Sequence, residues 1–330
     1  MRAAVCPVHG PPEGVRVEDR PVPEPGPGQV RVAVTAAAVN FPDVLLCANE
    51  YQHKVPAPFV PGSEFAGTVA ALGPGVDGLG VGDRVFGTVM VGAFAEQVVV
   101  GAGACTRTPA GVDDRHAAAF GVAHRTAYHS LRSVAQVAPG EEVVVLGAGG
   151  GVGLAAVQLA VLMGATVTAV ASSPEKLAAA RSMGATHLID HRAGDLRGAL
   201  KAALPDGADV VIDPVGGSLA EPALRALRYG GRFVVVGFAA GEIPRIPLNL
   251  VLLKGIEIRG FEFGSFMARA RDALARGEAE LTGWLADGRA RPHVGATFPL
   301  DATAAALRHV GDGKAVGKVV IDVVDGADGA

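Results

Sequence analysis

"VVVLGAGGGVGLAAVQLA", residues 143–160, is the stretch that decides the fold. It begins with apolar residues of strand type, continues with a glycine-rich turn and ends with a run that suits a helix. Glycine permits the tight turn and lets backbone amides approach a pyrophosphate, and the helix N-terminus adds partial positive charge. This order predicts a dinucleotide site at Gly150, Gly151, Val152 and Gly153; a glycine-rich turn without a ligand is the alternative.

Strand-type and helix-type runs alternate regularly through this part of the chain. The predicted strands are 141–148, 166–171, 187–191, 208–215, 232–238 and 255–263, and the predicted helices are 151–165, 173–185, 195–205 and 219–231. The alternation predicts an α/β fold with a doubly wound parallel sheet and helices on both faces. Residues 143–171 carry no charge and are long enough to span a membrane, but the glycines divide them into a strand and a helix of a buried core.

The residues before this alternation have a different composition. Short strand-type runs between proline and glycine turns predict a small, mostly antiparallel β-domain or barrel. With 330 residues, 49% of them hydrophobic, the chain is expected to form two domains. The strand-type run "GKVVIDV" near the C-terminus is expected to return to the first domain. We predict a catalytic domain of residues 1–125 and 261–330 and a nucleotide-binding domain of residues 126–260.

Composition excludes several classes of function. The net charge is −4 and the basic residues are scattered, which argues against nucleic acid or an anionic membrane as a partner. The N-terminal "MRAAVCPVHG" lacks the apolar segment of a secretory signal. The three cysteines fit free thiols in a reducing compartment. We therefore expect a cytoplasmic protein that acts on a small molecule.

The turn after the second strand of the predicted nucleotide domain, "AVASSPEKL" at 169–177, favours one dinucleotide over the other. NAD-specific sites place Asp or Glu at the end of this strand to hold a ribose hydroxyl, and Ala171 stands there instead. The expected pocket has hydroxyl donors and cations: Ser172, Ser173, Lys176, His191 and Arg192. These residues favour the 2′-phosphate of NADPH. Ser173 also suits an ordinary helix N-cap followed by proline, and both roles can hold together.

Several segments together resemble the medium-chain dehydrogenase/reductases, and more narrowly the quinone oxidoreductase branch that includes zeta-crystallin. They span nearly the whole chain and include "AAVNFPDVLL" (37–46), "VPGSEFAGTVAALGPGV" (60–76), "RTAYHSL" (125–131), "VLGAGGGVGLAAVQLA" (145–160) and "GATVTAVASSPEKLAAARSMGATHLID" (164–190). The resemblance implies a GroES-like barrel closed by the C-terminal segment, with the nucleotide domain inserted between. It also implies a homodimer joined at a sheet edge, for which "IPLNLVLLKGIEIRGF" (246–261) is apolar enough; an ordinary core strand is the alternative.

The resemblance further implies roles for residues near the nicotinamide. Thr126 matches the position that bonds the carboxamide, and Gly237 and Phe238 match positions that line the ring. Glu64 stands alone in an apolar run, and a buried carboxylate needs a partner, for which we predict Arg84 in a structural pair.

A metal is not expected. Zinc-dependent relatives place Cys where this chain has Asn40 and His where it has Ser63, and their third ligand falls near Val122. Independently of the family, no Cys/His spacing in this chain suits tetrahedral zinc.

Without a Lewis acid, hydride transfer suits conjugated acceptors, whose π system delocalises the arriving charge onto an oxygen that polar donors stabilise. The candidate catalytic residues are Asn40 as an amide donor, Asp43 as an orienting group and Tyr51 as a phenol donor. In related 2-enoyl-thioester reductases, a tyrosine eight residues after the matching aspartate acts as the acid, and Asp43 and Tyr51 have that spacing. Alternatively, Tyr51 is a half-buried loop aromatic, and Asn40 and Asp43 form a turn around Pro42.

These observations predict an NADPH-dependent, zinc-free oxidoreductase that reduces a quinone or another conjugated carbonyl or activated alkene. One alternative is a 2-enoyl-thioester reductase with Tyr51 as proton donor. Another, of a different class, is a protein that binds NADPH as a structural or sensor protein without turnover.

Overall fold

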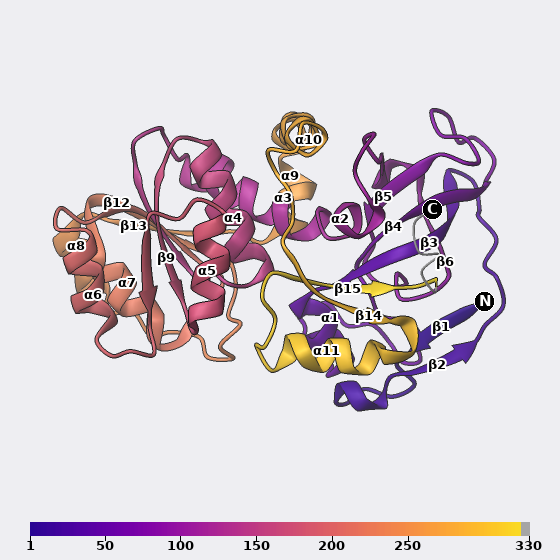
Figure 1. Cartoon of the computed structure of the whole chain (residues 1–330), viewed down its shortest axis with the longest axis horizontal. Coiled ribbons are helices and arrows are strands. Elements are labelled where there is room, and N and C mark those ends of the chain that lie inside the picture. Colours follow the sequence, from indigo (N-terminus) through magenta and orange to yellow (C-terminus); the bar gives the residue numbers. More distant parts are fainter. Residues whose placement is uncertain (325–330) are drawn as a thin grey trace. The chain divides into compact units, whose positions relative to one another are not determined.

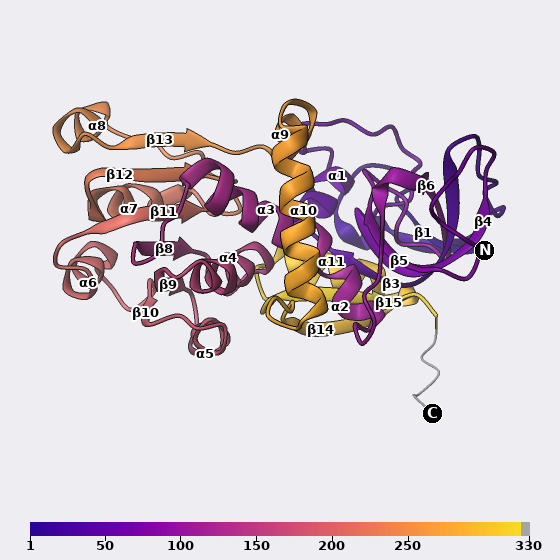
Figure 2. The same cartoon turned by 90° about the horizontal axis from the view of Figure 1, so that it is seen from above.

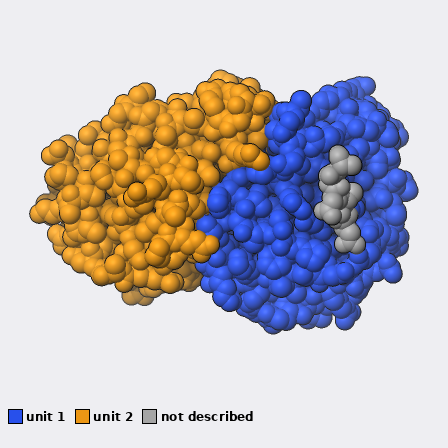
Figure 3. Space-filling view, viewed as in Figure 1, with its two compact units in different colours: residues 1–122, 292–330 blue, residues 123–291 orange. Residues whose placement is uncertain are grey.

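A computed structural model describes residues 1–324 and divides the chain into two compact units (Figure 3). The first unit consists of Met1–Val122 and the segment that starts at Pro292, and the second consists of Ala123–Arg291. The sequence analysis predicts that residues 261–291 belong to the catalytic domain. In the structure, these residues belong to the second unit. The second unit is thus inserted in the sequence between the two parts of the first.

The first unit is built on a mostly antiparallel sheet in the order β14-β15-β3-β4-β5-β7, with β6 also paired to β3. Its strands are β3 (Gln29–Val39), β4 (Glu64–Leu72), β5 (Arg84–Thr88), β6 (Gln97–Gly101), β7 (Cys105–Arg107), β14 (Val294–Pro299) and β15 (Lys318–Asp322), and β1 (Arg2–Val5) and β2 (Arg16–Asp19) form a separate pair. The C-terminal strand β15 pairs antiparallel with β3, Val319 opposite Val39. The predicted small β-domain and its closure by the C-terminal segment are therefore confirmed.

Three helices cover this sheet: α1 (Phe41–Cys47), α2 (Asp114–Ala118) and α11 (Thr303–Gly311). Helices α1 and α11 pack against each other and lie side by side in Figure 1. The buried core beneath them is apolar and includes Val32, Val34, Phe65 and Phe94.

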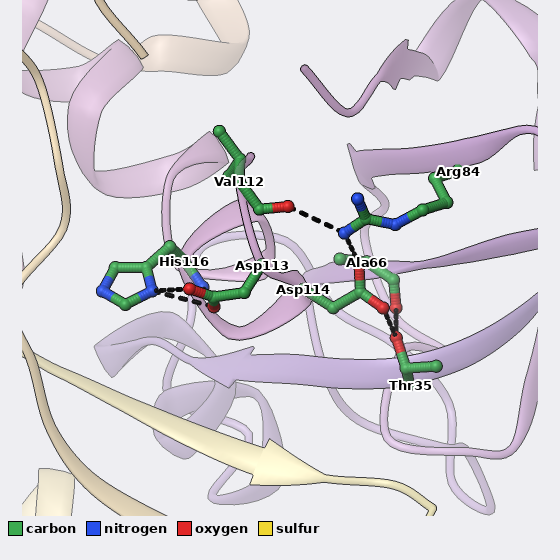
Figure 4. Close-up of polar contacts among 7 residues, drawn as sticks. All are labelled: Thr35, Ala66, Arg84, Val112, Asp113, Asp114 and His116. Carbon is green, nitrogen blue, oxygen red and sulfur yellow. Dashed lines mark hydrogen bonds and ion pairs between the residues drawn. The ribbon is translucent and has the colours of Figure 1, made fainter. Parts of the chain in front are cut away.

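Arg84 connects the sheet to the start of α2 by hydrogen bonds and an ion pair, as Figure 4 shows. Its Nη2 donates to the carbonyl of Val112 at 2.8 Å and to Asp114 Oδ1 at 2.5 Å. The other oxygen of Asp114 accepts from the Thr35 hydroxyl. The predicted pair of Arg84 with Glu64 is therefore wrong.

The register of two strands explains this error. Glu64 lies opposite Thr88 on the antiparallel pair β4 and β5, whereas Arg84 lies opposite Thr68. The two side chains thus stand at opposite ends of the ladder. Glu64 pairs instead with Lys318, a residue 254 positions away in the sequence.

The second unit is a six-stranded parallel sheet in the order β10-β9-β8-β11-β12-β13, and Figure 2 shows these strands one above another, from β13 at the top to β10. The strands are β8 (Glu142–Leu146), β9 (Thr166–Ala171), β10 (His187–Asp190), β11 (Ala208–Asp213), β12 (Leu227–Val235) and β13 (Glu257–Gly260). The helices are α3 (Gly121–His129), α4 (Gly151–Leu162), α5 (Pro174–Ser182), α6 (Leu196–Ala203), α7 (Ala220–Ala226), α8 (Leu248–Lys254), α9 (Phe263–Arg269) and α10 (Arg271–Ala286). The chain moves outward from β8 to β10 and then returns to β11, so the switch point lies between β8 and β11, where dinucleotides bind in such sheets.

The charge-free stretch is a strand and a helix of this core. Val143 to Leu146 are fully buried in β8, and most of α4 is buried as well. No helix in residues 1–324 is long and apolar enough to cross a membrane. The largest shift of a predicted boundary is at the end of α7: this helix ends at Ala226 and β12 begins at Leu227, because Leu227 already pairs with Ala208 before a bulge in the ladder.

Contacts of α3 with α10 explain why residues 261–291 belong to the second unit. Arg125 Nε and Nη2 donate to the two oxygens of Glu278 at 2.6 and 2.9 Å. The Tyr128 hydroxyl donates to Glu280, two residues further along α10. A β-carbon added at Gly277 would lie 2.7 Å from His129 Cε1, so the helices approach closely there. Sequence periodicity carries no information about such long-range pairs.

His129 makes the stability of this unit depend on pH. Its ring is fully buried, Nδ1 lies 2.9 Å from Ser133 Oγ, and Nε2 has no hydrogen-bond partner within the described residues. Burial, followed by the charge of Arg125, lowers the pKa of His129 from 6.5 to about 4. As the pH falls, the unfolded chain takes up the proton before the folded chain does. The contribution of neutral His129 to the free energy of unfolding is therefore fully present above pH 6.5 and is lost as the pH drops toward 4. We expect a loss of about 2 kcal/mol between about pH 7.5 and 5.

Urea unfolding at the two pH values measures this loss. The His129→Phe variant lacks the titrating group and serves as the control. An equal pH dependence in this variant would show that other groups cause the effect.

Candidate active site

The glycine-rich turn joins β8 to α4 at the switch point of the sheet. Gly147 follows β8 with a φ of +61°, a conformation that favours glycine. The amide of Ala148 donates to Val170 O at 3.0 Å, which ties the turn to β9. Gly150 is the N-cap of α4, and Gly151 begins the helix. The predicted residues Gly150, Gly151, Val152 and Gly153 thus form the first turn of a helix that starts at the ligand-binding edge.

Two glycines are required by close packing. A β-carbon at Gly153 would lie 2.1 Å from the carbonyl oxygen of Gly147, so α4 sits directly on the turn. A β-carbon at Gly149 would lie 2.4 Å from Lys176 Cβ. The stem of Lys176 therefore lies against the turn, and its ammonium extends to Ser172 Oγ.

The turn after β9 has the predicted arrangement. Ala171 ends the strand and is buried, and its carbonyl accepts from the amide of His191 at 3.1 Å. Ser173 caps α5, since its Oγ accepts from the amide of Lys176 at 3.3 Å. Lys176 Nζ donates to Ser172 Oγ at the same distance. The structure brings together all four of the predicted residues Ser172, Ser173, Lys176 and His191.

The pKa shifts show that positive groups crowd this turn. Burial lowers the pKa of Lys176, and the charge of Arg192 lowers it further. The pKa of His191 is lowered by burial and then by Arg192, with a smaller effect from Lys176. Asp190 is the carboxylate on the neighbouring strand, and its Oδ1 accepts from the amide of Arg192 at 2.9 Å. A bound dianion would relieve the repulsion among these cations.

The loops after β11 and β12 meet beside the glycine turn. Asp213 Oδ1 accepts from the amides of Val215 and Gly216, both at 2.8 Å, and the carbonyl of Asp213 accepts from Gly237 at 3.3 Å. Val215 in turn packs against Gly147, where a β-carbon would lie 2.6 Å from its Cγ2. The loop after β11 thus contacts both Gly237 and the glycine turn. Phe238 follows Gly237, and its ring lies near Gly216.

Sequence reasoning missed Asp213. Burial raises its pKa, while the two amide bonds act in the opposite direction. The signal was present: a carboxylate ends an apolar strand and precedes Gly216 and Gly217, both with positive φ.

Thr126 lies on α3, and its carbonyl accepts from Ser130 Oγ at 2.7 Å. The carboxamide role of Thr126 stays a prediction.

A buried polar cluster lies in the first unit, at the start of α1. Lys318 Nζ donates to Asn40 Oδ1 at 2.6 Å and to Glu64 Oε1 at 2.5 Å. Asn40 Nδ2 donates to Glu64 Oε1 at 2.9 Å and to Ser63 Oγ at 3.1 Å. Lys318 is 3% exposed and Glu64 is 0% exposed, so the ion pair is dry. The side-chain amide of Asn40 thus donates both of its hydrogens to residues of the first unit. Asn40 therefore has a structural role, in addition to any contact with substrate.

Asp43 stabilises the first turn of α1. Its Oδ2 accepts from the backbone amide of Asn40 at 2.8 Å. Complete burial raises the pKa of Asp43 to about 7, against the opposing effect of that hydrogen bond.

Tyr51 follows α1 and is half-buried against the apolar core of the first unit. Its backbone amide donates to Leu45 O at 3.2 Å, and its ring lies 5.8 Å from that of His53. The position of Tyr51 therefore depends on α1, and its role as a donor stays a prediction.

The residues at the zinc-ligand positions of metal-dependent relatives do not fit zinc. Asn40 and Ser63 are bonded to each other, and the amide of Val122 donates to Glu64 Oε2 at 2.8 Å. The ammonium of Lys318 lies against Asn40 and would repel a dication. Residues 1–324 contain no group of three or more His, Cys, Asp or Glu side chains that could hold a metal ion.

Lys318 was also missed by sequence reasoning. It is a single lysine at the start of the buried strand β15, in the run "GKVVIDV". A charge in such a run requires a partner, just as Glu64 does. The two could have been matched as opposite charges, but nothing in the sequence sets their distance in space.

Comparisons with known proteins agree with this geometry. The family model "Alcohol dehydrogenase GroES-like domain" matches residues 26–110, and "Zinc-binding dehydrogenase" matches residues 151–278. Quinone oxidoreductase-like protein 2 of Mus musculus is 37% identical over 325 residues, which are 98% of this chain and 92% of that protein. Part of the pikromycin polyketide synthase component PikAII of Streptomyces venezuelae is 37% identical over 311 residues, 93% of this chain and 8% of that protein.

A solved structure with the same architecture is the quinone oxidoreductase of Thermus thermophilus, which was also determined as its complex with NADPH. It is 34% identical and superposes with a TM-score of 0.85 over 98% of this chain and 100% of the other. The chain therefore belongs to the medium-chain dehydrogenase/reductase family, in its quinone oxidoreductase branch.

Proposed function

We propose that the protein is an NADPH-dependent, zinc-free oxidoreductase that reduces quinones or other conjugated carbonyl compounds. The observation that carries this proposal is the turn after β9, where Lys176, His191 and Arg192 gather and Ala171 replaces a carboxylate. The NADPH complex of the Thermus thermophilus relative supports the same cofactor. All three cysteines are free thiols, which fits a reducing compartment, and we propose the cytoplasm.

Bound NADPH supplies a hydride to the acceptor. The amides at the start of α4 bind the pyrophosphate, and Ser172, Ser173 and Lys176 bind the 2′-phosphate. The loop of Gly237 and Phe238 lines the nicotinamide. In the first unit, Asn40 and Asp43 hold the start of α1, and Tyr51 donates a hydrogen bond or a proton to the acceptor oxygen.

A panel of quinones, enones and enoyl thioesters, followed by loss of NADPH or NADH absorbance in parallel, tests this proposal. Turnover of quinones or enones with NADPH preferred supports it. A preference for NADH refutes the cofactor assignment. NADPH binding, seen as a rise in melting temperature, without turnover of any member of the panel favours the non-catalytic alternative.

A 2-enoyl-thioester reductase is the second candidate. The likeness to part of PikAII, a component of a polyketide synthase, and the eight-residue spacing from Asp43 to Tyr51 support it.

Tyr51→Phe distinguishes these two candidates. If Tyr51 is the proton donor to an enoyl thioester, kcat for that substrate is expected to fall about 100-fold, because a positioned acid contributes about 10²–10⁴-fold. Quinone reduction should keep its kcat, since solvent can protonate the reduced ring. Equal and small losses on both substrates would rule out an acid role for Tyr51.

We also propose that the protein is a homodimer joined along β13. This strand lies at the edge of the sheet, and large apolar side chains are exposed on it and on the neighbouring α8 and β12: Tyr229 (82%), Leu248 (75%), Leu252 (81%), Leu253 (72%) and Ile258 (41%). An uncovered apolar edge would aggregate, and a second copy would cover it.

Leu252→Asp is therefore expected to convert the dimer into a monomer in sedimentation velocity at micromolar concentration. A charge buried in an apolar interface costs several kcal/mol, on the order of a thousandfold in dissociation constant. Val81→Asp, at an exposed valine of the first unit, is the matched control and should leave the dimer intact. A wild-type monomer at that concentration would refute the proposal.

A further inference from the structure

The buried pair of Lys318 and Glu64 is not explained by stability alone. Removing two charges from water is costly, and apolar side chains of similar volume at such a site are often as stabilising or more so. Lys318 Nζ nevertheless has three acceptors: Val39 O at 3.3 Å, Asn40 Oδ1 at 2.6 Å and Glu64 Oε1 at 2.5 Å. Two of these three acceptors belong to the residues that lead into α1.

The charges determine the orientation of the Asn40 side chain. An amide has one face that accepts and one that donates. The ammonium of Lys318 binds Oδ1, and the carboxylate of Glu64 binds Nδ2, so only one of the two flipped orientations satisfies both. With apolar neighbours, the amide could rotate by half a turn at little cost.

The start of α1 is coupled to Tyr51 through the helix. Asn40 is the N-cap of α1, and its backbone amide is bound by Asp43. At the other end of this short helix, Leu45 O accepts from the amides of Glu50 and Tyr51 at 2.8 and 3.2 Å. A shift at the N-cap is therefore transmitted to the backbone of Tyr51.

We propose that Lys318 is a positioning residue for the reaction. Its ammonium, opposed by Glu64, holds Asn40 in one orientation, fixes the start of α1 and thereby places the Tyr51 hydroxyl. This inference rests on the proposed function in that Tyr51 acts on the acceptor, and it adds a residue from the C-terminal strand β15 to the set that determines turnover.

The test is the double variant Lys318→Met/Glu64→Gln, which removes both charges together. Lys318→Met alone would leave a buried carboxylate unpaired and endanger folding. In the double variant, we expect a melting temperature close to that of the wild type and a dissociation constant for NADPH within about twofold, because that site lies in the second unit. We expect kcat to fall about 10- to 100-fold for the substrates whose turnover falls in Tyr51→Phe, the range found when catalytic groups are misplaced.

A matched control lies on the same strand. Asp322 of β15 accepts from Arg115 Nε and Nη2 at 2.8 and 2.9 Å, an exposed pair away from α1. Arg115→Met/Asp322→Asn should leave kcat unchanged. Wild-type kcat of Lys318→Met/Glu64→Gln for those same substrates would overturn the proposal, and so would an equal loss in the control.

A second measurement does not depend on turnover. The chain has three tyrosines, so the ring signals of Tyr51 can be assigned by NMR with Tyr51→Phe as the reference. The double variant should shift or broaden these signals, and unchanged Tyr51 signals would refute the positioning role. Wild-type protein without any turnover would refute the proposed function instead, while the NMR result still decides the role of Lys318. If the double variant does not fold, Asn40→Ser keeps an N-cap, removes the amide oxygen that accepts from Lys318 and should give the same changes.

Discussion

Ala171→Asp is expected to reverse the cofactor preference, with the ratio of kcat/KM for NADPH to that for NADH falling about 100-fold or more. Ala171 ends β9 directly before Ser172 and Ser173. A carboxylate at this position repels the 2′-phosphate, and it accepts from the ribose hydroxyls of NADH. Both effects act in the same direction on the ratio, which is why the expected change is large.

Two further variants separate charge from volume. Ala171→Asn has nearly the size of aspartate without the charge, so it should lower binding of both cofactors by similar factors because the site is buried. Lys176→Met keeps the stem that lies against Gly149 and removes only the cation. It should weaken NADPH about tenfold and leave NADH unaffected. An unchanged ratio in Ala171→Asp would show that the 2′-phosphate does not bind at this turn.

Local patterns predicted much of the fold and of the nucleotide site. The alternation of strands and helices is set by burial within each segment, and it indicated the parallel sheet of the second unit. The glycines before α4 and the serines before α5 contact backbone groups that are only a few residues away in the sequence. The polar contacts among Ser172, Ser173 and Lys176 thus follow from their spacing on one helix turn.

Apart from Asp213, whose partners Val215 and Gly216 are local, the errors and omissions in the site and in the domain division concern partners far apart in the sequence. Arg84 was assigned to Glu64 because a buried carboxylate needs a partner, but the strand register separates the two residues. Lys318 reaches Glu64 only because β15 returns to pair with β3. The division of the chain moved from residue 260 to residue 291 because α10 packs on α3 through Arg125 and Glu278.

Gly153→Ala is the second change with a large expected effect. The added methyl group would lie 2.1 Å from the carbonyl oxygen of Gly147 and 2.8 Å from the Cα of Ala148. Both atoms belong to the backbone, so no side chain can rotate away, and α4 must move from the turn. We expect a loss of about 2–3 kcal/mol in the free energy of unfolding, as for overpacked cores. We also expect the dissociation constant for NADPH to rise about 100-fold, since the first-turn amides of α4 would no longer converge on the pyrophosphate.

Gly283→Ala provides the matched control for this change. Gly283 lies within α10 and has no atom within 4 Å of the added β-carbon, so alanine there should leave NADPH binding unchanged and stabilise the helix slightly. Titration of cofactor fluorescence and urea unfolding measure both quantities on the same samples. In the glycine-rich stretch 143–160, the function of Gly153 is to let α4 approach the preceding turn closely. Near-normal affinity in Gly153→Ala would therefore contradict the assignment of the pyrophosphate to this turn.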